Sequence, residues 1–500
     1  MPHNLPKTAR NTWLLLGAAT LLGLLSYRLW LLGQPWVGLY HDESYYYHWS
    51  LIPDFGYYSK PPMVAWIIGL SSSLWGATSA GIKLGPALCW FGTAIALGRI
   101  AAKIWNFRLG VLTAVIFYST PLAGFYSLFA TTDAPFLLFW ALALLGFINA
   151  QQAITAQRDP LLWWLAAGLA TGLGLLSKYT MFVLPFSFLV FLVTSPARRA
   201  QFQTLGPWLA GSVALALFSL NALWNIDNEF VAWQHTSDIA KLDGQALHPG
   251  ALFEFWGAQL GIFGLVGGLL IARWWRIWWA EARAKPELLA CLLGGAMLLI
   301  GISIQALMSR AFANWAAPVT LTLTLMLAAI AAQHLRWVLV AVASNVILLT
   351  VFYQWPVILA ITDSHQDKRI NPWFRVQDWA TPIAQSARLT PVDKSLPVAS
   401  DSRAVLANMS FALHPKQFPG AYWDADSSHI RDYYDQTINF DLLPAAQQQR
   451  RYLFALEAPI SEAQRASFHY IEPVAVIDNY FQWHPGKSLY LYRVGGFSGY

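Results

Sequence analysis

The sequence predicts an all-α polytopic membrane bundle of about eleven transmembrane helices, followed by a C-terminal α/β domain. Three observations support this fold class. Hydrophobic residues make up 56% of the 500 residues and charged residues only 12%, with a mean hydropathy of +0.42; about 25% charged residues is usual in soluble proteins. Long apolar stretches recur along the first 362 residues, and the composition changes after them. A soluble enzyme, a secreted disulfide scaffold and a disordered protein are excluded, because so few charges cannot cover a soluble particle of this size.

The apolar stretches are about 20 residues long, which is enough to cross roughly 30 Å of hydrocarbon. They fall at residues 12–32, 83–102, 109–128, 134–150, 161–177, 180–195, 205–225, 251–272, 287–307, 318–334 and 337–358. The first stretch is expected to stay as a helix, because no small-residue cleavage site follows it. Both cysteines, Cys89 and Cys291, lie in apolar runs. Cysteine chemistry and thiolate metal sites are therefore not expected.

The distribution of charge predicts the orientation of the spans. With the amino terminus in the cytoplasm, the inner ends and loops collect thirteen basic residues and the outer ones six. The positive-inside rule favours this orientation. Nine of the twelve acidic residues before residue 363 are then outside. We therefore expect the chemistry on the outer face. An odd number of spans places the carboxyl terminus outside as well.

A soluble domain is predicted at residues 363–500, after a transmembrane domain at 1–362. This part has 14 acidic and 13 basic residues in 138. It mixes short apolar runs typical of strands with helical patterns. The expected strands are Leu396–Ser400, Tyr452–Leu456, Pro473–Ile477 and Ser488–Tyr492, and the expected helices are Arg403–Ala412 and Ser461–Ala466. We read a small α/β domain on the outer membrane surface.

The first outer loop, residues 33–82, is rich in functional residue types. Its Tyr and Trp residues fit a helix lying at the headgroup level, but that interpretation does not explain the adjacent carboxylates of Asp42 and Glu43. Nor does it explain Lys60, which precedes two prolines that fix the backbone and aim the lysine. We predict functional roles for Asp42 and Lys60. Glu43 either orients the site or is a charge that favours the start of a helix.

Three more outer residues are candidates, each with a plainer alternative. Asp133 precedes Ala134-Pro135, and this could simply be a helix start. Lys178 lies in a tight turn, where a lysine can snorkel. Arg310 could hold a phosphate bidentately, or it could anchor a helix at the interface. Together these acids and cations suit group transfer from a lipid phosphate, with an acid that accepts a proton and cations that stabilise the departing phosphate.

A family resemblance rests on five motifs that occur in order: Asp42-Glu43-Ser44-Tyr45-Tyr46, Gly56-Tyr57-Tyr58-Ser59-Lys60-Pro61-Pro62, Thr132-Asp133-Ala134-Pro135, Gly172-Leu173-Gly174-Leu175-Leu176-Ser177-Lys178-Tyr179 and Asn314-Trp315-Ala316-Ala317-Pro318. They resemble the bacterial protein-mannosyltransferase-like GT-C glycosyltransferases, a group that includes the lipid A aminoarabinose transferase and the galacturonosyltransferases of lipopolysaccharide. The resemblance covers about residues 35–320.

The resemblance implies an inverting glycosyltransferase of the bacterial inner membrane that uses a polyprenyl-phosphate sugar on the periplasmic side. The implied acceptor is lipid A or lipopolysaccharide. Asp42 resembles the essential acid of the first outer loop, Asp133 the second outer acid, and Lys60 the lysine that contacts the carrier phosphate. Arg310 and Lys178 are further candidates for that phosphate, and Lys178 matches a recurrent lysine of the family. Glu43 joins the catalytic candidates.

The expected partners are the lipid-linked donor, a glycolipid or protein acceptor and membrane lipids, with no nucleic acid. No nucleotide or redox cofactor is expected and no metal ligand set is visible, although a divalent cation near the acids stays open. A protein O-mannosyltransferase is the alternative within the same class. A lipid-linked sugar flippase is the alternative from another class. It fits less well, because the ionisable residues lie at the outer ends of the spans and no inverted repeat is visible.

Overall fold

The computed structural model describes residues 7–240, 247–362, 370–376, 395–426, 428–478 and 487–500. The chain divides into two compact units. The first comprises residues 1–29, 60–64 and 86–352 and contains most of the apolar helices. The second comprises residues 30–59, 65–85 and 353–500, so part of the loop predicted at residues 33–82 belongs to the same unit as the C-terminal region.

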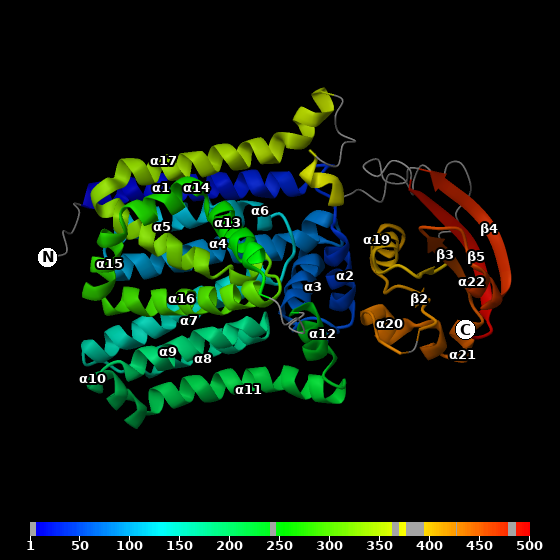
Figure 1. The fold of residues 1–500 in the computed structure, drawn as a ribbon, viewed down its shortest axis with the longest axis horizontal. Coiled ribbons are helices and arrows are strands. Elements are labelled where there is room, and N and C mark those ends of the chain that lie inside the picture. The colour runs from blue at the N-terminus through cyan, green and yellow to red at the C-terminus, as the bar shows by residue number, and fades with distance from the viewer. Residues whose placement is uncertain (1–6, 241–246, 363–369, 377–394, 427, 479–486) are drawn as a thin grey trace. The chain divides into compact units, whose positions relative to one another are not determined.

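Helices account for almost all of the described structure before residue 363. They are α1 (Lys7–Leu32), α2 (His41–Leu51), α3 (Met63–Trp75), α4 (Ser79–Ile104), α5 (Phe107–Tyr118), α6 (Pro121–Tyr126), α7 (Asp133–Thr155), α8 (Leu161–Leu175), η1 (Tyr179–Phe182), α9 (Val183–Val193), α10 (Pro196–Arg199), η2 (Ala200–Gln203), α11 (Leu205–Asp227), α12 (Val231–Ala240), α13 (Pro249–Phe263), α14 (Leu265–Arg273), α15 (Trp275–Ala284), α16 (Pro286–Met308), η3 (Ala313–Ala316) and α17 (Val319–Ile361). The long helices of the first unit run side by side along a common direction (Figure 1).

The predicted membrane bundle is confirmed, and each of the eleven predicted stretches falls mainly on helix. Among the described residues, six helices are long and apolar enough to cross a membrane, or seven if the bent pair α13 and α14 is one span. The predicted stretches 109–128, 161–177 and 180–195 correspond to shorter apolar helices. The last two predicted spans lie in α17, which is interrupted at His334. The chain is a multi-span membrane protein.

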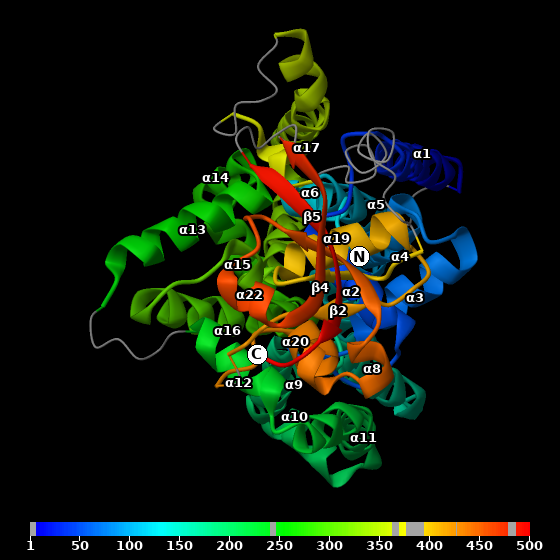
Figure 2. The same ribbon diagram turned by 90° about the vertical axis from the view of Figure 1, so that its right-hand side faces the viewer.

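Two helix breaks were not predicted. The stretch 109–128 divides into α5 and α6, where Thr120 caps a new helix that starts at Pro121. Proline suits the first helical position because its missing N–H would have no partner there. The second break is at Gly264, whose φ of +109° favours glycine. The chain bends by 103° between α13 and α14 at this point. As a result, α13 lies across the direction of its neighbours (Figure 2). Asn345 donates a hydrogen bond to the Phe263 carbonyl exposed by this break.

Small residues allow α7, α8 and α11 to pack closely. A Cβ at Gly146 of α7 would lie 2.8 Å from the Ala167 backbone of α8. A Cβ at Gly168 of α8 would lie 2.6 Å from the Ala210 backbone of α11. Helix association in lipid relies on such close approach, because lipid tails are as apolar as the side chains. This packing fixes the helix ends that carry the first part of the site.

The C-terminal sheet domain, as we call residues 398–500, is an α/β unit as predicted. Its elements are β1 (Val398–Ser400), α19 (Arg403–Leu413), β2 (Ala421–Tyr422), α20 (Tyr433–Ile438), η5 (Phe440–Leu442), α21 (Ala445–Gln448), β3 (Arg451–Leu456), α22 (Glu462–Ala466), β4 (Phe468–Asp478) and β5 (Ser488–Phe497), preceded by η4 (Pro372–Arg375). The strand order is β2-β1-β3-β5-β4. β1 pairs in parallel with β2 and β3, whereas β5 is antiparallel to β3 and β4.

All four predicted strands and both predicted helices of this domain are present, whereas β2, α20 and α21 were not predicted. Its core is aromatic, with Phe440, Phe454, Phe468 and Phe497 buried together. Much of the predicted start of the domain, residues 363–369 and 377–394, lies outside the described residues.

The aromatic residues of α2 pack against other segments of the second unit. Tyr45, Tyr47 and Trp49 are buried in the second unit. The Tyr47 ring packs edge-on against Phe411 of α19, and the Tyr45 ring packs edge-on against Tyr434 of α20. Amphipathic rings that suit the headgroup level of a membrane also suit an interface between protein segments, and the second use is the one seen for these three side chains.

Candidate functional site

The first unit brings Asp133 and Lys178 together. Asp133 is the first residue of α7, and Lys178 directly precedes η1. The Lys178 ammonium lies 2.7 Å from Oδ1 of Asp133, and the Asn314 amide donates a hydrogen bond of 2.7 Å to Oδ2. The Asp133 side chain is 2% exposed and that of Lys178 19%. We call these three residues the Asp133 cluster.

Both residues contact side chains of other elements. Thr132, the N-cap of α7, makes no side-chain capping hydrogen bond, and both carboxylate oxygens of Asp133 face side chains from other elements. Asp133 is therefore more than a helix start. The Lys178 ammonium also lies 3.4 Å from the Asn314 carbonyl and above the Phe136 ring, so protein groups surround it.

Lys60 lies in a turn next to the Lys178 turn. The backbone N–H of Met63 donates a hydrogen bond of 3.0 Å to the Leu176 carbonyl, which ties the start of α3 to the end of α8. The Lys60 side chain is half-buried. Arg310 is exposed, and its guanidinium lies over the Phe312 ring. It forms no ion pair within the described part of the chain.

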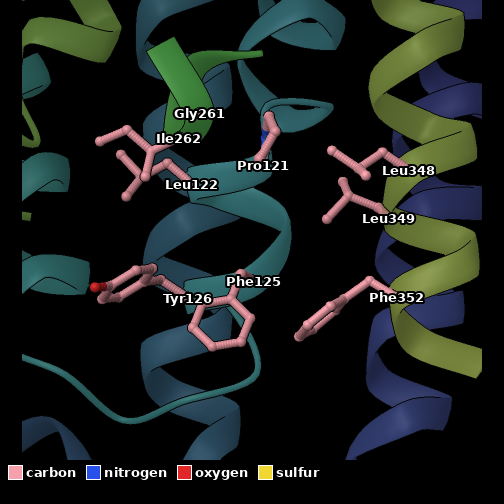
Figure 3. Close-up of a pocket in the computed structure, with 9 residues that line it drawn as sticks. All are labelled: Pro121, Leu122, Phe125, Tyr126, Gly261, Ile262, Leu348, Leu349 and Phe352. Atoms are coloured by element: carbon pink, nitrogen blue, oxygen red, sulfur yellow. The ribbon is translucent and has the colours of Figure 1, made fainter. Parts of the chain in front are cut away.

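An apolar cavity of about 260 Å³ lies in the same unit (Figure 3). Leu348, Leu349 and Phe352 of α17 face Pro121 and Phe125 of α6 across it. The remaining lining residues are Leu122, Tyr126, Gly261 and Ile262. Tyr126 carries the one side-chain oxygen among these nine residues. The cavity is thus suited to an apolar chain.

The second unit pairs Asp42 with Arg403. Asp42 is the second residue of α2, and its Oδ1 lies 3.1 Å from Nη2 of Arg403, the first residue of α19. His41 Nε2 lies 3.6 Å from the same oxygen. The two paired side chains are 33% and 36% exposed. The Asp42 carboxylate is therefore accessible to solvent, unlike a buried structural carboxylate.

Glu43 has different surroundings from its neighbour. Its carboxylate accepts a hydrogen bond of 2.8 Å from the Tyr40 N–H and closes a capping box at the start of α2. The same oxygen lies 3.1 Å from the ammonium of Lys83, and both side chains are buried. Lys83 also donates a hydrogen bond to the Gly38 carbonyl. These contacts favour a role in fixing α2 over direct contact with substrate.

Burial shifts several titratable groups around α2. Burial lowers the pKa of His48 to about 3, and its Nδ1 lies 2.6 Å from the Tyr434 hydroxyl. Burial also raises the pKa of Asp432 to about 6, although Arg403 and the capped N–H groups of α20 oppose the shift. For Arg403, burial disfavours the cation, but Asp42 and the neighbouring oxygens outweigh it and raise the pKa above its usual value. Arg403 is therefore a permanent cation beside Asp42.

The described residues include no group of three or more His, Cys, Asp or Glu side chains placed to hold a metal ion. Cys89 and Cys291 are buried and unpaired.

Two residues of these clusters were not candidates from the sequence. Asn314 belongs to one of the five sequence motifs, so the sequence marks its position. The sequence does not indicate that Asn314 contacts Asp133. Arg403 had no signal, because it is 361 residues from Asp42 along the chain.

Comparisons with known proteins agree with this architecture. Residues 59–224 match the family model of the dolichyl-phosphate-mannose-protein mannosyltransferases. The lipid A galacturonosyltransferase RgtD of Rhizobium johnstonii is 29% identical over 326 residues, which is 64% of this chain and 66% of that protein. The undecaprenyl phosphate-alpha-4-amino-4-deoxy-L-arabinose arabinosyl transferase of Photorhabdus laumondii is 24% identical over 47% of this chain and 43% of its own length. The chain thus spans less than two thirds of these relatives.

The fold matches over nearly the whole chain. The crystal structure of apo ArnT from Cupriavidus metallidurans has a TM-score of 0.64 at 17% identity and covers 97% of this chain and 98% of its own. The structure of the same protein bound to undecaprenyl phosphate has a TM-score of 0.62. The chain is therefore a homologue of the lipid A galacturonosyltransferase and the aminoarabinose transferases, with a protein-mannosyltransferase-like region at residues 59–224 and the GT-C fold of ArnT.

Proposed function

We propose that this protein is an inverting glycosyltransferase of the bacterial inner membrane that moves one sugar from a polyprenyl-phosphate carrier to lipid A or lipopolysaccharide on the periplasmic side. The observation that carries the proposal is that one helix bundle contains both an apolar cavity and a charged cluster. An amphipathic donor has the same two parts, an isoprenoid chain and a phosphate. The relatives named above support this donor and acceptor class.

In the proposed reaction an oxygen of the acceptor attacks the anomeric carbon of the donor sugar. The bond from that carbon to the phosphate oxygen breaks, and polyprenyl phosphate leaves with the electron pair. A single displacement inverts the anomeric configuration. If the acceptor is a hydroxyl, Asp42 takes its proton; if it is a phosphate, Asp42 orients an acceptor that is already anionic.

Cations are needed on the leaving side. Lys60 is the leading candidate for the carrier phosphate, with Arg310 as a weaker one, because both are cations in loops that the sequence predicts on the outer side. Lys178 already has Asp133 as its partner. We assign Lys178 to holding Asp133 and the helix ends, and Glu43 to holding α2. The positive-inside pattern supports placing these residues and the carboxyl terminus in the periplasm.

Mass analysis of lipid A and core oligosaccharide, from cells with and without this protein, tests the proposal. We expect one additional sugar on the glycolipid only when the protein is present. The same sugar found on Ser or Thr of periplasmic proteins would instead identify a protein O-mannosyltransferase. A change in lipid-linked sugar across the membrane without any glycosylated product would identify a transporter and overturn the proposal.

A further inference from the structure

The position of Arg403 is not explained by its own helix. It is the first residue of α19, where Ser402 already serves as the N-cap through its side chain. A cation at a helix N-terminus is unfavourable because the macrodipole is positive there. Asp42, in contrast, lies in the first turn of α2, where a negative charge is favoured. The position of Arg403 therefore stabilises the Asp42 carboxylate, whereas it does not stabilise the start of α19.

The guanidinium is held in place by its surroundings. It lies 5.0 Å from the centre of the Tyr45 ring, a cation–π distance. Tyr45 is buried, and its hydroxyl accepts a hydrogen bond from the Tyr433 N–H. Among the described residues, the charged or titratable groups around this pair include His41, Tyr45 and Tyr46 of α2 together with Asp432, the N-cap of α20, and Tyr434.

Helices α2 and α19 are joined by further contacts. The Ser44 hydroxyl donates a hydrogen bond of 2.7 Å to Oδ1 of Asn408, and both side chains are buried. Tyr47 packs edge-on against Phe411 at 5.4 Å. Because these contacts fix α2 against α19, they hold the guanidinium group of Arg403 in one position relative to Asp42.

The contact engages one side of the carboxylate. Arg403 and His41 both approach Oδ1 of Asp42. Among the described residues, Oδ2 accepts no hydrogen bond, and the side chain is one third exposed. One oxygen is thus held and the other is presented, which is how an orienting residue prepares a catalytic acid or base.

We infer that Arg403 is the positioning residue of Asp42, and that the C-terminal sheet domain thereby completes the acceptor side of the active site. The inference rests on the role proposed above for Asp42. Arg403 holds Oδ1 so that Oδ2 faces the acceptor oxygen, and it keeps a positive charge beside a carboxylate that an anionic acceptor must approach. The domain then contributes to catalysis through α19 as well as covering α2.

A double-mutant cycle in reconstituted protein tests this inference. Arg403→Ala, Arg403→Lys, Asp42→Asn and the double variant Asp42→Asn/Arg403→Ala are compared for kcat and donor KM. Arg493→Ala is the control, because Arg493 is a half-buried arginine of the same domain, paired with Glu472 at 3.0 Å. We expect Arg403→Ala to lower kcat by roughly 10-fold to 100-fold, as misplacement of a catalytic group does, with donor KM unchanged. Arg403→Lys should keep part of the activity, because lysine keeps the positive charge but lacks the planar guanidinium group with its several N–H donors.

The kcat of the double variant shows whether Arg403 acts through Asp42. If Arg403 acts through Asp42, the double variant is no slower than Asp42→Asn alone. Losses that multiply would show that Arg403 acts independently and would overturn the inference. An inactive Asp42→Asn together with a normal Arg403→Ala would overturn the inference and leave the proposed function intact, whereas a normal Asp42→Asn would remove the proposed role of Asp42 itself. If Arg403→Ala does not fold, Arg403→Lys and Arg403→Gln take its place in the cycle.

Discussion

Asn314 donates a hydrogen bond of 2.7 Å to Oδ2 of Asp133, while Lys178 occupies Oδ1 at the same distance. Three elements distant in sequence, the start of α7, the turn before η1 and the short helix η3, therefore meet on one buried carboxylate. The arrangement locks these helix ends together. Any proposal for Asp133 must include this structural role beside a catalytic one.

Asp133→Asn should destabilise the protein, because it leaves the Lys178 ammonium with a neutral partner. Breaking a buried ion pair costs about 3–5 kcal/mol, and the partial exposure of Lys178 places the expected loss at the lower end. The thermal unfolding midpoint in detergent measures it. Removing both charges in Asp133→Asn/Lys178→Met should recover part of the loss. Glu457→Gln is the control, since its pair with Lys487 is exposed and worth about 0–1 kcal/mol. Equal shifts in Asp133→Asn and Glu457→Gln would contradict the account.

The variant Glu43→Gln should distinguish the structural role of Glu43 from the catalytic role proposed for Asp42. The amide can still accept from the Tyr40 N–H, but Lys83 loses its buried counter-charge. We expect a clear loss of stability, on the order of 3 kcal/mol, while transfer per folded molecule stays close to wild type. Unfolding midpoint and kcat are measured on the same preparation, with Asp42→Asn as the adjacent control. A stable Glu43→Gln without transfer activity would make Glu43 catalytic.

Asp432 should make stability depend on pH. Its folded pKa of about 6 exceeds the usual 3.8, because it is buried, so the folded state binds the proton more tightly. Its contribution is most favourable below about pH 4 and is lost as pH rises through 6. The loss is about 3 kcal/mol, at roughly 1.4 kcal/mol per pKa unit.

Asp432→Asn removes this titration and keeps an N-cap for α20, since Asn caps as well as Asp. The gain in unfolding midpoint of this variant over wild type should be small at pH 4 and larger at pH 7. A difference that is the same at both pH values would show that Asp432 does not titrate in this range.

Filling the apolar cavity should impair use of the donor. Gly261 lines the cavity, and a Cβ there meets nothing within 4 Å, so Gly261→Leu adds a side chain without a backbone clash. We expect donor KM to rise several-fold for long-chain donors and little for donors with few isoprene units. Gly257→Leu is the control, because Gly257 is in the same helix with equally open space and does not line the cavity. The same change in both variants would assign the effect to α13 and not to the cavity.

The membrane bundle could be predicted because burial in lipid requires long apolar runs, and these are visible in composition alone. The strands of the sheet domain could be predicted for a similar reason, as in β3, where five consecutive buried residues follow Arg451. The break at Gly264 could not. A glycine in an apolar run also suits close helix packing, and only the positive φ distinguishes the two uses.

The sequence predicted individual residues of the candidate site, but it did not predict which of them contact one another. Asp133 and Lys178 stood out as charges at span ends, yet their contact depends on how α7 and α8 pack. The aromatic residues of α2 were assigned to the membrane surface because their rings suit both a headgroup layer and a protein interface. Whether Asp42, Lys60 and Arg310 have the roles proposed for them remains a prediction.

The most direct measurement is transfer of label by purified protein in liposomes that contain a labelled polyprenyl-phosphate sugar and lipid A. The account predicts label on lipid A with wild type. For Asp42→Asn it predicts a fall of about 100-fold or more, the scale of acid–base groups, with donor binding retained. Label that crosses the membrane without joining an acceptor, or near-normal transfer by Asp42→Asn, would contradict it.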